Sequence, residues 1–168
     1  MKITFLGTGT SQGIPMIGSN DPVCLSHNSK DKRLRSSIMI SWDDNCYIID
    51  CGPDFRQQML RENIQAINGV LFTHEHSDHT AGIDDLRPYT YKMGEVPIYA
   101  QERVIESLKI RFSYIFETEN RYAGAPKLIE NIIDSNSFML NEVQVTPIAV
   151  MHGKLPITGY RFGNVAYI

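Results

Sequence analysis

The chain has 168 residues, of which 42% are hydrophobic and 21% charged, and its formal net charge is −3 at pH 7. A chain of this length is expected to form one domain and to bury roughly 70% of its unfolded surface without help from disulfides or metals. The composition excludes a disordered tail, a collagen-like repeat and a coiled coil. The negative charge argues against a surface that grips long nucleic acids, so nucleic acid is not an expected partner.

The cysteines and the start of the chain indicate a reducing compartment. Cys24, Cys46 and Cys51 are odd in number and form no CxxC pair, so a disulfide framework is not expected. Only six residues precede the first glycine, which is too few for a signal peptide, and no apolar run approaches the length of a membrane span. We therefore expect a cytoplasmic protein without a membrane partner.

The first part of the chain predicts a strand, a long loop and a hairpin. Residues 3–6 are apolar and end at a glycine, which predicts a strand. Residues 7–35 are rich in Gly, Ser, Asn, Asp and Pro without a sustained period, so they predict a long ordered loop. Residues 37–42 and 46–50 flank a polar turn at residues 43–45, which predicts a hairpin.

Patterns further along the chain predict further helices and strands. Pro53 suits the first turn of a helix over residues 53–62, and residues 101–116 place apolar side chains on one helical face. Residues 70–73 and 143–150 are apolar runs that predict strands. Together the elements indicate an α/β domain whose sheet is mostly antiparallel and faced by helices.

The last segment predicts a second hairpin, because residues 159–162 and 165–168 flank Gly163-Asn164. The chain stops at Ile168, inside an apolar strand and without a polar tail. Natural termini seldom have this character. We therefore expect residues 1–168 to be an N-terminal fragment of one domain whose last strands, helices and ligands are missing.

The strongest chemical signal is the segment HEHSDH at residues 74–79, directly after a predicted buried strand. His74 and His76 are two residues apart in extended chain, so they share a face and can reach one ion. Asp78 and His79 follow where a helix is expected to begin, with Asp78 as a suitable cap. Imidazole and carboxylate groups without thiolates suit Zn²⁺, Mn²⁺ or Fe²⁺ in a hydrolytic site.

Three features together resemble the metallo-β-lactamase superfamily: HxHxDH after a strand, Asp50-Cys51-Gly52 after an earlier strand, and His152-Gly153 after a later one. The opening FLGTGTSQGIP and the segments RLRSS and DCGPDFRQQ narrow the match. They resemble the cyclic phosphodiesterase branch, typified by phosphoribosyl 1,2-cyclic phosphate phosphodiesterases, with ribonuclease Z as a more distant relative. The resemblance implies an αββα metallo-β-lactamase sandwich with metals on the loops that follow strands.

The same resemblance implies two divalent metal ions, Zn or Mn, in the full-length protein. His74, His76 and His152 correspond to the ligands of one ion. Asp78 and His79 correspond to ligands of the second ion. The family also uses an aspartate that bridges both ions and a final histidine, and neither is found in this chain.

Three weaker signals concern residues around these ligands. Asp50 corresponds to the family's first-motif acid, which supports the histidine loop without touching the metal. Arg33 and Arg35 belong to a cationic stretch that is either a solvated face or an anion-binding lip for a phosphodiester. Only Cys24 remains of the three cysteines that hold a structural zinc in many members of the branch, so that zinc is not expected.

The resemblance implies hydrolysis of a small, cyclic phosphodiester by a water activated between two metal ions, with Asp78 orienting that water or taking its proton. A ribonuclease Z-like nuclease and a thioester or lactone hydrolase are alternatives with the same ligands. In a third alternative this chain, lacking two ligands, is a metal-binding domain without activity. Exposed apolar surface at the truncated edge would favour a homodimer.

Overall fold

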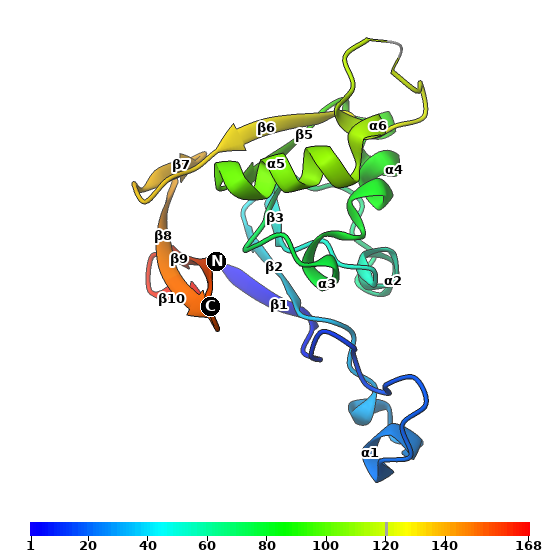
Figure 1. Ribbon diagram of the computed structural model, residues 1–168. Coiled ribbons are helices and arrows are strands. Elements are labelled where there is room, and N and C mark those ends of the chain that lie inside the picture. Colours follow the sequence, from blue (N-terminus) through cyan, green and yellow to red (C-terminus); the bar gives the residue numbers. More distant parts are fainter. Residues whose placement is uncertain (120) are drawn as a thin grey trace.

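The computed structural model describes residues 1–119 and 121–168 and shows two β-sheets packed face to face. Helices cover the outer face of the larger sheet, and the loop that carries the short helix α1 projects away from the sheets (Figure 1). The expected α/β class, with two sheets packed as a sandwich, is confirmed. Within the described residues, no helix is both long enough and apolar enough to cross a membrane.

The larger sheet has six strands in the order β1-β2-β3-β4-β5-β6. Their bounds are Lys2–Gly7, Ser37–Trp42, Asn45–Ile49, Gly69–Leu71, Val96–Ala100 and Leu128–Ile132. Strands β1 to β3 pair antiparallel, whereas β3 to β6 pair parallel. The expectation of a mostly antiparallel sheet is therefore wrong for strands β3 to β6 of the larger sheet. Helical crossovers between successive strands return the chain to the same edge, and such connections make neighbouring strands parallel.

The smaller sheet is antiparallel throughout, in the order β10-β9-β8-β7. Its strands are Phe138–Leu140, Val143–His152, Leu155–Phe162 and Val165–Tyr167. The expected hairpin around Gly163-Asn164 is confirmed, but β9 begins at Leu155, four residues earlier than the pattern predicts. The sequence alone did not identify β5, β6 or β7.

The helices are short. They are α1 Pro22–Leu25, η1 Ser29–Asp31, α2 Phe55–Arg61, α3 Ser77–Thr80, η2 Ile83–Leu86, α4 Arg87–Met93, α5 Glu102–Arg111 and α6 Ser113–Phe116. The single helix expected over residues 101–116 is interrupted, because Phe112 leaves the helical conformation at φ −126° and ψ 41°. The expected loop over residues 7–35 contains two short helical turns, α1 and η1.

Two apolar cores follow from the alternation of side chains along the central strands. On β2, Ile38 and Ile40 face the smaller sheet and pack with Val145, Tyr160 and other buried residues there. Met39, between them, faces the helices and joins a core with α2 and α5. The larger sheet is thus buried on both faces, which holds the ends of β3 and β4 in fixed positions. The structure shows Cys24, Cys46 and Cys51 as free thiols.

Candidate metal centre

The candidate site lies where four segments end at one edge of the two sheets. Asp50 directly follows β3, and Thr73 and His74 follow the neighbouring parallel strand β4. His76 precedes α3, and His152 is the last residue of β8 in the other sheet. Because parallel strands bring their carboxyl ends to the same edge, Asp50 and Thr73 lie together although 23 residues separate them.

Asp50 leaves β3 in the left-handed backbone region, with φ 64°. Aspartate tolerates this region better than most residues, because its short polar side chain bonds locally. The Asp50 amide donates to the Leu71 carbonyl over 2.9 Å, and its side chain is fully buried. The turn directs the carboxylate across the end of β4, toward the histidine loop.

The buried carboxylate of Asp50 accepts hydrogen bonds from two sides. Its Oδ1 accepts from the Thr73 amide over 2.8 Å, and its Oδ2 lies 2.7 Å from Nδ1 of His79. The carboxylate can only accept from that nitrogen, so Nδ1 carries the proton and Nε2 of His79 faces the site. Asp50 therefore bonds to the histidine loop at Thr73 and His79, and its role in supporting metal ligands remains a prediction.

The Thr73 hydroxyl connects the same carboxylate to His74, and the sequence analysis missed this residue. Its Oγ1 lies 2.9 Å from Oδ2 of Asp50 and 2.8 Å from Nδ1 of His74. When the hydroxyl donates to the carboxylate, it accepts from Nδ1–H of His74. This assignment of protons leaves Nε2 of His74 as a free ligand atom.

The ring nitrogens of His74, His76 and His152 converge. One nitrogen from each residue lies within 4.8 Å of the other two, and Nε2 of His74 is 3.1 Å from Nδ1 of His76. Two nitrogens on one tetrahedral zinc ion at ~2.1 Å are ~3.4 Å apart, so this spacing fits a shared ion. The donor set, three imidazoles without a thiolate, also suits a divalent cation that keeps open positions. Metal binding by these residues remains a prediction.

Asp78 and His79 form a second donor pair beside this cluster. Oδ2 of Asp78 lies 3.2 Å from Nε2 of His79, and both side chains are partly buried. The sequence analysis expected Asp78 to cap α3, but Asp78 lies within the first turn of this helix. His76 occupies the cap position and makes no capping bond with its side chain. The short helix therefore turns the Asp78 carboxylate toward His79, where the pair could hold a second cation.

The protein environment shifts the pKa values of two imidazoles in opposite directions. Burial, with the nearby imidazoles of His79 and His76, lowers the pKa of His74 from 6.5 to about 4. Burial alone lowers the pKa of His79 too, but the hydrogen bond and charge of Asp50, with the charge of Asp78, raise it overall. Of these two imidazoles, His74 therefore binds a proton less readily than His79.

A cavity of about 180 Å³ is lined by His74, His79 and His152, whereas His76 and Asp78 are not among its lining residues. Its walls also include Ile157 and Tyr167 of the smaller sheet and Ile168 directly after β10, residues that the sequence analysis did not assign to the site. Burial, with the charge of Asp50, raises the pKa of Tyr167 well above its ordinary value. The phenol therefore keeps its proton at neutral pH and is a hydrogen-bond donor.

The structure does not place Arg33 or Arg35 among the residues that line this cavity. Arg35 forms an ion pair with Asp54 at 2.8 Å and donates from Nε to the Ser11 carbonyl over 2.9 Å. Arg33 is exposed and lies 3.4 Å from the Thr8 hydroxyl. Arg35 therefore holds the long loop against the start of α2, and substrate binding by either arginine remains a prediction.

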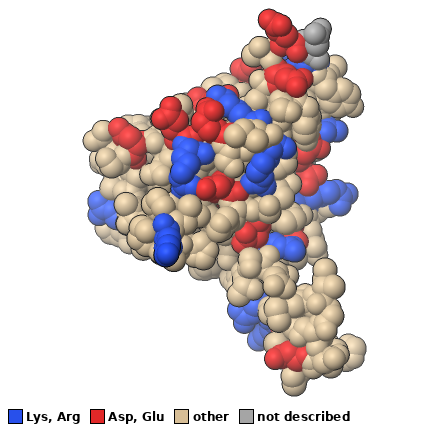
Figure 2. Space-filling view, viewed as in Figure 1, with Lys and Arg blue, Asp and Glu red and all other residues tan. Residues whose placement is uncertain are grey.

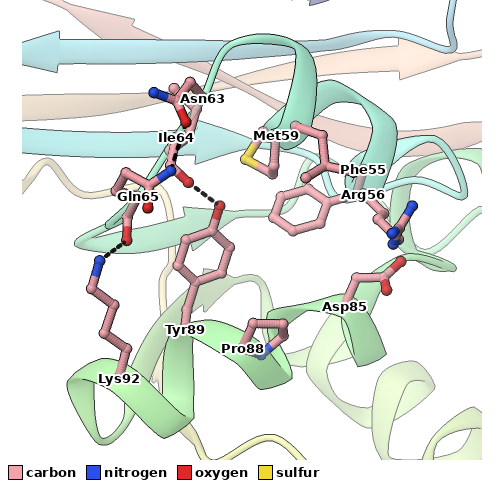
Figure 3. Close-up of a pocket in the computed structure, with 11 residues that line it drawn as sticks. Phe55, Arg56, Met59, Asn63, Ile64, Gln65, Asp85, Pro88, Tyr89 and Lys92 are labelled. Carbon is pink, nitrogen blue, oxygen red and sulfur yellow. Dashed lines mark hydrogen bonds between the residues drawn. The ribbon is translucent and has the colours of Figure 1, made fainter.

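A larger cavity of about 360 Å³ lies between α2 and α4 and is lined mostly by apolar side chains (Figure 3). Two polar groups on its wall are already bonded. The Tyr89 hydroxyl donates to the Ile64 carbonyl over 2.9 Å, and Lys92 Nζ donates to the Gln65 carbonyl over 3.0 Å. None of the residues that line it belongs to the histidine cluster. The smaller cavity is therefore the candidate reaction site.

Comparison with known proteins agrees with this geometry. The chain is 42% identical over 171 residues to an octanoyltransferase of Porphyromonas gingivalis, matching 100% of this chain and 34% of that protein. It is 26% identical to a ribonuclease Z of Methanococcus maripaludis, over 98% of this chain and 48% of the relative. The crystal structure of a diphosphatase from the PhnP family superposes with a TM-score of 0.89 and 39% identity, over 99% of this chain and 64% of that one.

A sandwich of two sheets with a histidine cluster on the loops after its strands defines a domain of the metallo-β-lactamase class. The beta-lactamase superfamily domain matches residues 45–168, and the chain belongs to this family. The resemblance inferred from the sequence is therefore confirmed, with ribonuclease Z as a more distant relative. The chain spans about a third to two thirds of the length of these relatives.

Proposed function

We propose that the full-length protein is a metal-dependent hydrolase that cleaves a small, cyclic phosphodiester. The observation that carries the proposal is the convergence of three histidine nitrogens within 4.8 Å, beside the Asp78–His79 pair. These two neighbouring donor groups fit the two divalent ions, Zn or Mn, that the family resemblance implies. The similarity to a diphosphatase of the PhnP family supports phosphoryl chemistry.

Asp78, Asp50 and Tyr167 would each have a separate role in the reaction. Bound divalent cations would lower the pKa of water in the site to about 7 and offset charge on the phosphoryl oxygens. Asp78 would orient that water and take its proton. Asp50 bonds directly to His79 and reaches His74 through the Thr73 hydroxyl. It would thereby keep both imidazoles in the tautomer that presents Nε2. The Tyr167 phenol could donate a hydrogen bond to a phosphoryl oxygen.

The surface charge argues against a long RNA as substrate. On the face shown in Figure 2, basic and acidic side chains are interspersed over α5 and its surroundings. Nucleic-acid binding relies on phosphate contacts from concentrated positive charge. We therefore place a ribonuclease Z-like activity second, although that enzyme is a relative.

Diphosphate hydrolysis is a further candidate, because a diphosphatase is 39% identical over nearly the whole chain. Both reactions need the same metal ions and a water placed in line with the leaving oxygen, so the donor set does not separate them. The octanoyltransferase match covers only 34% of that protein, so its name is a weak guide to chemistry at this site. Thioester or lactone hydrolysis and a domain without activity are the remaining alternatives.

The test measures turnover by the full-length protein loaded with Zn²⁺ or Mn²⁺. The substrates are bis-p-nitrophenyl phosphate, a cyclic nucleotide, a diphosphate ester, a thioester and a lactone. Asp78→Asn should remove most of the phosphodiester turnover, because the amide neither takes a proton nor offsets a second cation. Asp44→Asn is the matched control, since Asp44 is exposed in the β2–β3 turn. Turnover of the thioester alone, or no turnover of any substrate, would overturn the proposal.

A further inference from the structure

One arginine on α5 contacts both halves of the metal centre. Arg103 forms an ion pair with the Glu75 carboxylate through one terminal nitrogen. Its other terminal nitrogen donates to the Pro156 carbonyl over 2.6 Å. Glu75 belongs to the loop at the end of the larger sheet, whereas Pro156 belongs to β9 of the smaller sheet. A single guanidinium therefore spans the boundary between the two sheets.

Each end of this bridge lies beside metal-ligand candidates. Glu75 stands between His74 and His76 in the sequence. Pro156 pairs with Met151 in the β8–β9 ladder, and the next pair toward the hairpin tip joins His152 to Leu155. Arg103 thus connects the backbone beside two histidines on one sheet with the backbone beside the third histidine on the other.

We infer that Arg103 is a positioning residue that sets the place of His152 relative to His74 and His76. The inference rests on the proposed metal site. Among the described residues, the hydrogen bonds of Arg103 go to Glu75 and Pro156 and to none of the candidate ligands, so it acts through the hairpin and not on the ion. Arginine suits this task, because its planar fork presents two donors in fixed geometry to two acceptors.

The hairpin tip needs such a contact. His152 is exposed and is followed by Gly153, which has a positive φ of 63° at the turn. Two other bonds join the smaller sheet to the end of β4: Thr158 N to Thr73 O at 3.0 Å and Tyr160 Oη to Phe72 O at 2.6 Å. Both lie further from the tip than Pro156. Strand ends far from such bonds open most easily, which would leave His152 free to move.

Glu75 depends on the same bridge. One of its carboxylate oxygens is paired with Arg103, and the other is buried without a hydrogen-bond partner among the described residues. Arg111, also on α5, donates to the Glu75 carbonyl and to the Thr80 hydroxyl. Among the described residues it has no hydrogen bond to β9. Of these two arginines, only Arg103 links the loop to the hairpin.

The test compares Arg103→Met with Lys109→Met in the full-length protein. Lys109 is on the same helix, has similar side-chain exposure at 36% against 38%, and pairs with Glu130 at 2.8 Å away from the site. Zinc affinity is measured by competition with a chromophoric chelator. Arg103→Met should weaken it by about tenfold or more, the usual effect of removing a group that positions a ligand. Lys109→Met should leave it unchanged.

The His152→Ala background separates positioning of His152 from a general effect on folding. In that background Arg103→Met should cause no further loss of zinc affinity, because the residue on which it acts is gone. A tenfold loss that persists in His152→Ala, or equal affinities for Arg103→Met and the unchanged protein, would overturn the inference.

Amide hydrogen exchange of the metal-free protein gives a readout that needs no bound ion. Arg103→Met should speed exchange in residues 150–157 and leave the centre of the larger sheet unchanged, and Lys109→Met should do neither. Unchanged exchange in residues 150–157 would contradict the inference even if zinc binds normally. Failure of the wild-type protein to bind zinc would instead refute the proposed function. Amide hydrogen exchange of the metal-free protein would still decide the role of Arg103.

Discussion

Nδ1 of His79 donates to the fully buried carboxylate of Asp50 over 2.7 Å. The same carboxylate reaches His74 through the Thr73 hydroxyl. One buried charge therefore orients an imidazole from each of the two neighbouring donor groups. Displacing it should disturb both groups together, which makes Asp50 the residue most suited to a first test of the site.

We expect Asp50→Asn to destabilise the metal-free protein by about 1.5–3 kcal/mol, because charge-assisted hydrogen bonds to Thr73 and His79 are lost in a buried place. Zinc affinity should fall by about 10–100-fold. Asparagine tolerates the positive φ of this position, so backbone strain is not the cause. Denaturant unfolding and chelator competition measure the two effects. Asp134→Asn, at an exposed position, should change neither by a measurable amount.

Thr73→Val removes the hydroxyl that joins Asp50 to His74 and keeps the shape of the side chain. We expect a loss of about 1 kcal/mol in stability and weaker zinc binding, whereas Thr73→Ser should retain both. Thr90→Val is the matched control, because the buried Thr90 hydroxyl donates to the Arg87 carbonyl far from the site. It should lose similar stability at unchanged zinc affinity. Equal zinc affinities for Thr73→Val and Thr73→Ser would show that the hydroxyl has no role in orienting His74.

Gly52 lies against the helix that carries Asp78, where a Cβ atom would be 2.0 Å from the Asp78 carbonyl oxygen. Gly52→Ala must therefore displace α3, at a cost of about 1–3 kcal/mol, and it should weaken binding at the Asp78–His79 pair. Gly69→Ala is the graded comparison, since its closest contact would be 3.0 Å. Thermal unfolding and metal stoichiometry measure both variants. Full stability of Gly52→Ala would mean that the contact between these segments is looser than described.

The Tyr160 hydroxyl donates to the Phe72 carbonyl over 2.6 Å and joins the smaller sheet to the end of β4. Tyr160→Phe leaves that buried carbonyl unpaired, so we expect a loss of about 1–2 kcal/mol and faster amide exchange in β8 and β9. Tyr89→Phe removes a comparable bond to the Ile64 carbonyl within the helical layer. It should leave exchange in β8 and β9 unchanged. The same exchange pattern in both variants would refute a specific role of Tyr160 between the sheets.

The sequence was most informative where chemistry depends on short spacing. His74 and His76 share a face because the chain is extended there, and two residues of extended chain always return to the same side. The hairpin at residues 163–164 and the strand that ends near His152 follow from local turn and apolar patterns in the same way. The order of the parallel strands β4 to β6 did not follow, since it depends on how helical crossovers pack.

By itself, the sequence determined which donor groups the protein carries and which local elements present them, because residue type and short-range periodicity are properties of adjacent residues. Only the tertiary structure decided that His152 meets His74, that Thr73 joins Asp50 to the histidine loop, and that Arg103 reaches Pro156. These contacts join segments from two sheets and a helix. Their geometry is set by packing of both faces of the larger sheet, which no short stretch of sequence encodes.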